Sequence, residues 1–307
     1  MNVLITGGAG YIGIELAYRL AAADAIELVT IYDSFSRASY GVFCGLRKFK
    51  GKVRFVEEEI LNNRTLMHEV KRHDAVVHLA AYTNKRDAAS AHQFEQINNW
   101  GTALVADAIR EADEPKRVIY LSSMAVYGPG EIRARDQEPK PSSYYSISKL
   151  RGERHISSLP DSSSALIVRS PSVFGYSKNL HVDSGFNRMV FDAVLRGRVL
   201  LHGDDEANNP HVYIDDLVLY LESKVLDYGH VGLDIAPFFN CSGMQVYEEL
   251  QTKVPDLEVI FVDQNLYASS QRVTDADLAS SRSASTSLSE GLGFFMQKFT
   301  IGKEGIN

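Results

Sequence analysis

Tyr145 and Lys149 are the two residues of this sequence whose types and spacing are best suited to catalysis. They stand four positions apart in a stretch with a helical pattern, so their side chains approach the same point on one helix face. A phenol has a pKa of about 10 in water, and it accepts a proton at neutral pH only where a nearby cation stabilises the phenolate. The spacing therefore predicts that Tyr145 is an acid/base activated by Lys149. The alternative is a chance pair on a solvated helix face.

An apolar strand that ends at Leu121-Ser122-Ser123 precedes this helix by about one loop. In open α/β sheets the ligand crevice lies at the carboxyl ends of the strands. A hydroxyl at this strand end therefore faces the same crevice as the phenol.

A glycine-rich turn near the start of the chain predicts a dinucleotide site. An apolar strand over residues 2–6 leads into Gly7-Gly8-Ala9-Gly10-Tyr11-Ile12-Gly13 and then into a helical pattern over residues 14–23. This order satisfies the fingerprint G-x-G-x-x-G. A side chain would block the tight turn, the approach of backbone N–H groups to a pyrophosphate, and the packing of helix on strand. The helix N-terminus also offers N–H donors and a partial positive charge to the anion.

The next predicted strand, over residues 27–32, ends at Asp33. This is about 20 residues after the fingerprint, where an acid that binds the ribose hydroxyls is expected. Because a carboxylate repels the additional phosphate of NADP, we expect NAD as the cofactor. Arg37 is the nearby residue that would favour NADP. The alternative is a glycine-rich loop followed by a surface aspartate.

Together these motifs resemble the extended short-chain dehydrogenase/reductase superfamily, specifically its NAD-dependent sugar epimerase/dehydratase group, with a pattern like that of UDP-glucose 4-epimerases. The resemblance covers nearly the whole chain. The matching motifs, in order, are residues 6–13, Asp33, residues 78–81, Asn98-x-x-Gly101-Thr102, residues 122–128, Tyr145 with Lys149, Arg169 with Val173-Phe174-Gly175, and residues 214–217.

The resemblance implies a role for each site residue. Tyr145 is the acid/base, Lys149 also bonds the nicotinamide ribose, and Ser123 holds the reacting sugar oxygen. The residues expected to bind NAD are Gly7, Gly10, Tyr11, Ile12, Gly13, Asp33, Glu59, Ile60, Leu79, Ala80, Ala81, Asn98, Ser122, Tyr145 and Lys149. The residues expected to bind the substrate are Ser123, Tyr145, Ser172, Arg188 and Asn209.

Asn98 is expected chiefly to tether helices near the site, as in the family, and His78 to be a core histidine. Glu59-Ile60 falls where the family carries Asp-Ile beside the adenine. No metal site is expected, because His181, His202 and His211 show no ligand spacing with cysteines or acids.

Two departures from the family pattern bear on the reaction. Dehydratases of the family follow the active-site hydroxyl with Asp-Glu, whereas this chain has Met124-Ala125 and so lacks that proton donor for elimination. Family members commonly grip the diphosphate with an arginine where this chain has Asn209, and a second arginine motif is replaced by residues 264–267. Either another cation, first of all Arg188, holds the diphosphate, or the substrate has no diphosphate.

Three hypotheses follow from these residues. The first is an NAD-dependent epimerase of a nucleotide sugar, acting through a 4-keto intermediate. The second is an NAD-dependent dehydrogenase or ketoreductase of a related sugar or polyol, which would use the same residues. The third is a non-enzymatic NAD sensor, disfavoured because a sensor needs no activated phenol. A homodimer is expected through helices over residues 101–112 and 146–158, which pair in relatives.

The elements that must position these residues alternate regularly. Apolar strand runs at residues 53–57, 75–80, 118–122 and 165–169 are interleaved with helical patterns at 64–72, 91–112 and 144–158. This alternation predicts an α/β fold, a Rossmann-type doubly wound parallel sheet with a smaller interleaved C-terminal substrate domain. We expect residues 1–174 and 210–230 in the NAD-binding domain, and residues 175–209 and 231–307 in the substrate domain. The serine-rich stretch 269–289 is expected to be a flexible loop.

Composition limits the class of protein. The chain has 307 residues with 45% hydrophobic content, enough for a full core, and a net charge of -7 with no basic run. Nucleic acid is therefore not an expected partner. No apolar run reaches the length of a membrane span, and Met1 leads directly into a strand, so we expect a cytoplasmic protein. Cys44 and Cys241 are expected to pack as small hydrophobes.

Overall fold

A seven-stranded sheet lies at the centre of the computed structural model, which describes residues 1–49, 51–83, 91–202, 208–227, 231–262 and 271–300. The strand order is β11-β7-β5-β4-β1-β2-β3, and every neighbouring pair is parallel. The strands are β1 (Asn2–Thr6), β2 (Leu28–Asp33), β3 (Val53–Glu57), β4 (Ala75–His78), β5 (Arg117–Ser123), β7 (Ser164–Ser170) and β11 (Gly232–Ile235). The predicted doubly wound parallel sheet is confirmed.

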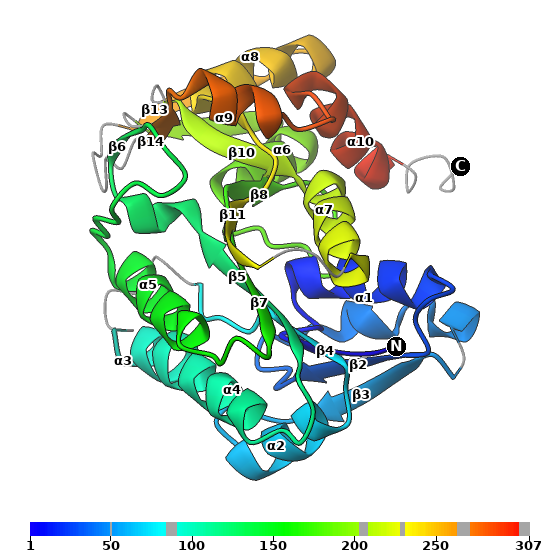
Figure 1. The fold of residues 1–307 in the computed structure, drawn as a ribbon. Helices are drawn as coiled ribbons and strands as arrows, with labels where there is room; N and C mark the ends of the chain where they lie inside the picture. Colours follow the sequence, from blue (N-terminus) through cyan, green and yellow to red (C-terminus); the bar gives the residue numbers. More distant parts are fainter. Residues whose placement is uncertain (50, 84–90, 203–207, 228–230, 263–270, 301–307) are drawn as a thin grey trace.

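Helices cover both faces of this sheet (Figure 1). On one side lie α1 (Tyr11–Ala22) and α7 (Ile214–Leu226); on the other lie α2 (Asn63–Lys71), α4 (Gly101–Arg110) and α5 (Tyr144–Ser157). Successive strand side chains point to opposite faces. In β1, accordingly, Val3 and Ile5 join the first apolar cluster and Leu4 joins the second. Burial on both faces explains why these strands are continuous apolar runs.

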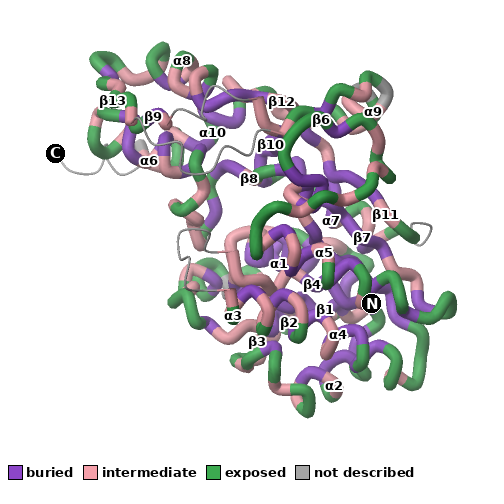
Figure 2. The backbone as a smooth tube through the Cα atoms, turned by 90° about the vertical axis from the view of Figure 1, so that its left-hand side faces the viewer, coloured by how far each residue is buried: buried purple, intermediate pink, exposed green. Residues whose placement is uncertain are grey.

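A second group of elements stands at one end of the sheet (Figure 2). Its strands form a three-stranded sheet from β8 (Ser172–Phe174), β10 (Asn209–Tyr213) and β12 (Phe239–Cys241), and pairs of β9 (Arg198–His202) with β13 (Glu258–Val262) and of β6 (Gly130–Ile132) with β14 (Gln271–Val273). Its helices include α6 (Gly185–Arg196), α8 (Gly243–Lys253), α9 (Ala276–Ser281) and α10 (Leu288–Thr300).

Several expectations need correction or remain predictions. The serine-rich stretch forms β14 and α9 within its described part, because Asp275 caps α9 and β14 finds a partner in β6. Cys241 is buried as expected, but Cys44 is exposed. The domain boundaries stay a prediction, although parallel pairing with β7 places β11 in the large sheet.

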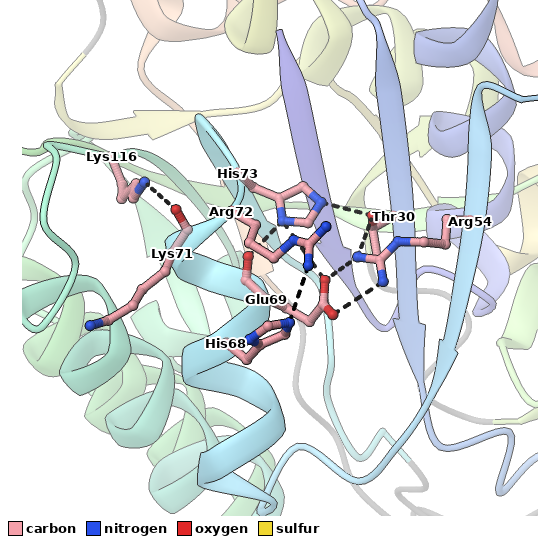
Figure 3. A network of polar contacts seen from close by, with 8 residues as sticks. All are labelled: Thr30, Arg54, His68, Glu69, Lys71, Arg72, His73 and Lys116. Carbon is pink, nitrogen blue, oxygen red and sulfur yellow. Dashed lines mark hydrogen bonds and ion pairs between the residues drawn. The ribbon is translucent and has the colours of Figure 1, made fainter.

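A buried polar network anchors α2 to the sheet (Figure 3). The Arg54 guanidinium on β3 pairs with both oxygens of the Glu69 carboxylate and donates to Thr30 Oγ1 on β2. His73 Nε2 lies 2.7 Å from the same Thr30 oxygen, and its Nδ1 lies 2.6 Å from the Glu69 carbonyl oxygen. Because each buried polar group has a partner, the network is structural.

Candidate active site

The glycine turn between β1 and α1 packs so closely that side chains are excluded. Gly7 has a φ of 70°, and a Cβ there would lie 2.6 Å from the Ala80 nitrogen. A Cβ on Gly13 would lie 2.7 Å from Gly8 Cα. Glycine is therefore required here by the turn and by packing. The same packing brings Leu79 and Ala80, which follow β4, against the turn.

Asp33 at the end of β2 is bonded to that turn. Its Oδ2 accepts from the Ala9 N–H (3.0 Å), and its Oδ1 accepts from the Phe35 N–H (2.9 Å). Burial raises the pKa of the carboxyl, and the two backbone hydrogen bonds oppose that rise. A fixed carboxylate beside a glycine-rich turn fits the adenosine ribose and pyrophosphate of a dinucleotide.

Two other expected contacts with the adenosine lie at the end of β3. Glu59 is exposed, and its carbonyl oxygen accepts from the Tyr32 hydroxyl at 3.0 Å. Ile60 is buried and packs against Gly101, where a Cβ would lie 2.9 Å from its Cγ2. Of these two residues, Glu59 is the one on the surface and Ile60 the one in the core.

A capping box starts α5 directly before Tyr145 and Lys149. Ser143 Oγ accepts from the Ser146 N–H, and Ser146 Oγ accepts from the Ser143 N–H. Each bond satisfies a donor that the helix end would leave unpaired. Tyr145 consequently lies in the first helical turn and Lys149 one turn later.

Ser123 lies beside Tyr145. Its hydroxyl accepts from the Ala125 N–H at 3.2 Å, which caps the 3₁₀ turn Met124–Tyr127. A hydrogen bond from Ser123 lowers the pKa of the Tyr145 phenol, but burial has the larger effect and leaves that pKa raised. The expectation that Lys149 brings the phenol below its usual pKa is therefore not met in the protein alone.

Lys149 is buried one helical turn after Tyr145. Its ammonium lies 4.2 Å from the centroid of the Tyr120 ring. Burial lowers the pKa of Lys149 to about 7, while the charge of Glu153 opposes that lowering. Burial thus favours the neutral amine of Lys149, and the Glu153 carboxylate favours its ammonium form.

A chain of hydrogen bonds connects β1 to the first turn of α5. His78 Nδ1 lies 2.6 Å from Thr6 Oγ1, and Nε2 lies 2.9 Å from Thr102 Oγ1. Because Thr102 donates to the Asn98 carbonyl oxygen, Nε2 carries the imidazole proton. The pKa of His78 falls to about 3, chiefly through burial. His78 is a core histidine, as predicted.

Asn98 continues this chain as a tether. Its Nδ2 donates to Ser148 Oγ on α5 (2.9 Å), and its carboxamide bonds both backbone groups of Tyr82. Asn98 lies in a π-helical turn, Phe94–Trp100, between α3 (Ala91–Gln93) and α4. The tethering role predicted for Asn98 agrees with these bonds.

A family model named "NAD dependent epimerase/dehydratase family" matches residues 3–223. The chain belongs to the NAD-dependent epimerase/dehydratase family. The cofactor of the family is NAD, as expected.

Relatives in this family catalyse more than one reaction. The chain is 27% identical over 238 residues to a dTDP-glucose 4,6-dehydratase of Mycobacterium tuberculosis, covering 76% of this chain and 70% of that protein. It is 29% identical over 227 residues to a UDP-glucose 4-epimerase of Mycolicibacterium smegmatis, covering 71% of each.

Solved structures share the fold. A UDP-glucuronic acid 4-epimerase from Bacillus cereus, crystallised with UDP-glucuronic acid and NAD, superposes with a TM-score of 0.83 at 22% identity, over 98% of this chain and 99% of that one. A dTDP-glucose 4,6-dehydratase from Bacillus anthracis, in complex with NAD, gives 0.82 at 19% identity, over 99% and 98%.

A buried ionic network lies around Glu153, one turn beyond Lys149 on α5, and the sequence motifs assigned it no role. Arg169 binds Glu153 through Nε–Oε1 (3.0 Å) and Nη2–Oε2 (2.7 Å), and Ser122 Oγ donates to the same carboxylate at 2.5 Å. Ser122 was expected to contact NAD, but in the structure its hydroxyl donates a hydrogen bond to Glu153. The spacing of Lys149 and Glu153, one turn apart on α5, was the available signal.

Three of the expected substrate residues, Ser172, Arg188 and Asn209, lie in the second group of elements. Arg188 and Arg196 on α6 share the buried Asp192 carboxylate, with N–O distances of 2.7 and 3.0 Å. Ser172 is exposed on β8. Asn209 Oδ1 accepts from the Gln271 N–H at 2.8 Å, a bond that an arginine side chain, having no acceptor, cannot make. Asn209 therefore has a structural partner as well as a predicted substrate role.

Two further observations concern the described residues alone. No helix among them has both the length and the apolar character needed to cross a bilayer. No three His, Cys, Asp or Glu side chains within these ranges are grouped as a metal ion would require.

Proposed function

We propose that this chain is an NAD-dependent 4-epimerase of a nucleotide sugar. The observation that carries the proposal is the turn after Ser123. Met124 is 1% exposed and packs with Tyr127, Ile132, Ile235, Phe238 and Val273, and Ala125 follows it. Neither side chain can donate a proton, so this turn supplies no acid for expelling a hydroxyl group as water.

The same residues support oxidation followed by reduction at one carbon. Tyr145 takes the proton of the sugar 4-hydroxyl while Ser123 holds the same oxygen. Bound NAD⁺ supplies a hydride acceptor and a positive charge. Because the protein alone keeps the Tyr145 pKa raised, that charge favours loss of the phenolic proton. Tyr145 then returns the proton to the oxygen after the 4-ketone has presented its other face.

The test is to incubate the protein and NAD⁺ with UDP-glucuronic acid, UDP-glucose and dTDP-glucose in D₂O and to follow the sugars by NMR. We expect the 4-epimer of one of them, with the hydrogen on C4 retained and no free NADH accumulating. Tyr145→Phe should lower the rate by several powers of ten while still binding NAD.

Each other outcome points elsewhere. A new C6 methyl signal would assign the chain to the dehydratases. NADH that accumulates in proportion to product would support the dehydrogenase. If no nucleotide sugar binds, the substrate is a polyol or sugar without a nucleotide.

A further inference from the structure

The segment 175–183, between β8 and α6, is bonded to the start of α1. The Tyr11 hydroxyl donates to the Gly175 carbonyl oxygen at 2.8 Å. Glu15 Oε1 accepts from Ser177 Oγ (3.1 Å) and from the Lys178 N–H (3.0 Å). Part of the substrate-side group of elements is thereby fixed to the helix that follows the dinucleotide turn.

Asn179 is the residue of this segment that reaches the turn itself. Its Nδ2 donates to the carbonyl oxygen of Ala9, inside the glycine fingerprint, and to that of Ser39 (3.0 Å). Its Oδ1 accepts from the Gly41 N–H at 3.1 Å. A Cβ on Gly41 would lie 2.5 Å from that Oδ1, so a glycine is what allows this close approach.

Arg37 makes a second connection between the same parts of the molecule. Its guanidinium donates to Thr83 Oγ1 (3.3 Å) in the loop after β4, lies 3.1 Å from His181 Nδ1, and pairs with Asp183 Oδ2 at 3.2 Å. Both members of the ion pair are about half exposed. Such pairs contribute little on their own, whereas the bonds of Asn179 are to backbone groups and do not depend on ionisation.

The two connections together reach three neighbouring strand ends. Ala9 lies in the turn after β1, Arg37 lies shortly after Asp33 at the end of β2, and Thr83 lies after β4. These strand ends are where the adenosine half of a dinucleotide binds. Segment 175–183 is bonded to Ala9 and Arg37 directly, and to Thr83 through Arg37, so it lies over the part of the sheet edge where the adenosine is expected.

We propose that Asn179 is a cofactor-retention residue: through its bonds to Ala9, Ser39 and Gly41 it holds segment 175–183 across the bound dinucleotide. The proposal rests on the proposed function, because an epimerase must keep its reduced cofactor until the hydrogen has been returned. NAD leaves when these bonds open.

The test measures release of NADH. The protein is loaded with NADH, mixed with excess NAD⁺, and the decay of NADH fluorescence gives the dissociation rate. We expect Asn179→Ala to release NADH at least ten times faster than the wild type, and Asn179→Asp, which keeps the acceptor for Gly41 but loses both donated bonds, to fall between. Arg37→Ala should change the rate less than twofold.

Asn240→Ala is the matched control. Asn240 is likewise an asparagine whose side chain bonds backbone groups, here the N–H and the carbonyl oxygen of Val273, but both residues lie in the second group of elements. Its release rate should equal that of the wild type even if its melting temperature falls as much as that of Asn179→Ala. If Asn179→Ala does not fold, Asn179→Asp and Gly41→Ala decide the question.

Release rates of these variants within twofold of the wild type would overturn the retention role. This test does not depend on whether the proposed reaction is correct, because the release rate of NADH is measured without any sugar. A wild type that epimerises nothing but retains NADH through Asn179 would keep this inference and lose the proposed reaction.

Discussion

Arg188 and Arg196 share one carboxylate, and this sharing leaves the Asp192 cluster with a net positive charge. The cluster is the cation we expect to face a diphosphate, with Arg188 as the contacting residue. A charged hydrogen bond contributes about 1.5–3 kcal/mol. Arg188→Ala should therefore weaken binding of the nucleotide sugar by roughly 10- to 100-fold, measured by calorimetry, with NAD affinity unchanged. Arg196→Ala removes the other arm of the same pair and serves as the control. Equal losses in the two variants would argue for a structural role of the cluster.

Asp33 should determine which dinucleotide binds. Its carboxylate is fixed between the Ala9 and Phe35 N–H groups, and it repels a 2′-phosphate. Arg37 is the residue that could form an ion pair with the 2′-phosphate, but its guanidinium already pairs with Asp183. We expect NAD to bind more tightly than NADP in fluorescence titrations, and Asp33→Ser to narrow the difference. Tighter binding of NADP to the wild type would contradict this.

At the scale of elements, the packing of α5 on β5 sets the height of Lys149 and Tyr145 above the sheet. Gly152 is the contact point: a Cβ there would lie 2.8 Å from Tyr120 Cζ. Gly152→Ala should push α5 outward, lower the melting temperature and reduce turnover.

Gly293→Ala is the control, because this glycine lies in α10 with nothing within 4 Å of an added Cβ. It should stabilise the protein by about 0.5–1 kcal/mol. A Gly152→Ala protein with wild-type stability and turnover would refute this account of α5.

Elements defined by short-range patterns were predictable from the sequence. Helices α1, α2 and α5 and the parallel central sheet follow from local periodicity and the βα alternation. Strands β6 and β14 did not, because each is three residues long and pairs with a partner that is distant in the sequence. The hydrogen-bond partners of Asn209 and Ser122 could not be predicted from the sequence either, because a motif identifies a residue but not the neighbour that its side chain bonds.

At the scale of the whole molecule, buried neutral histidines should make the protein sensitive to acid. Burial lowers the pKa of His73, that of His78 to about 3 and that of His211 to about 4. The unfolded chain, with histidine pKa values of about 6.5, therefore binds more protons below that pH. Stability is present above about pH 6.5 and is lost as the pH falls toward 4.

The melting temperature should consequently decline steadily from pH 7 to pH 4.5. At a pH two units below the unfolded-state pKa, one histidine that stays neutral in the folded protein lowers the free energy of unfolding by about 2.7 kcal/mol. Asp33 and Asp215, whose pKa values are raised by burial, act in the opposite sense at the lower end of this range. A melting temperature that is constant over the range would mean that the histidines are accessible to water.

The helices expected to form a homodimer carry exposed aromatic side chains. Trp100, directly before α4, and Tyr144, the first residue of α5, are each 61% exposed. We predict a dimer through this face, so Trp100→Glu should elute as a monomer in size-exclusion chromatography. Phe261→Glu, at an aromatic residue 67% exposed on β13, should not change the elution volume.

The turn that carries Ser123 is anchored from far along the chain. Gln271 Nε2 donates to the carbonyl oxygens of Met124 (3.0 Å) and Gly128 (2.6 Å), the latter 143 positions away in sequence. At about 5–20 residues per second during synthesis, a ribosome needs roughly 7 to 29 s to cover that distance. During this interval a nascent chain already contains the complete dinucleotide turn, but the segment that anchors the turn carrying Ser123 has not yet been made.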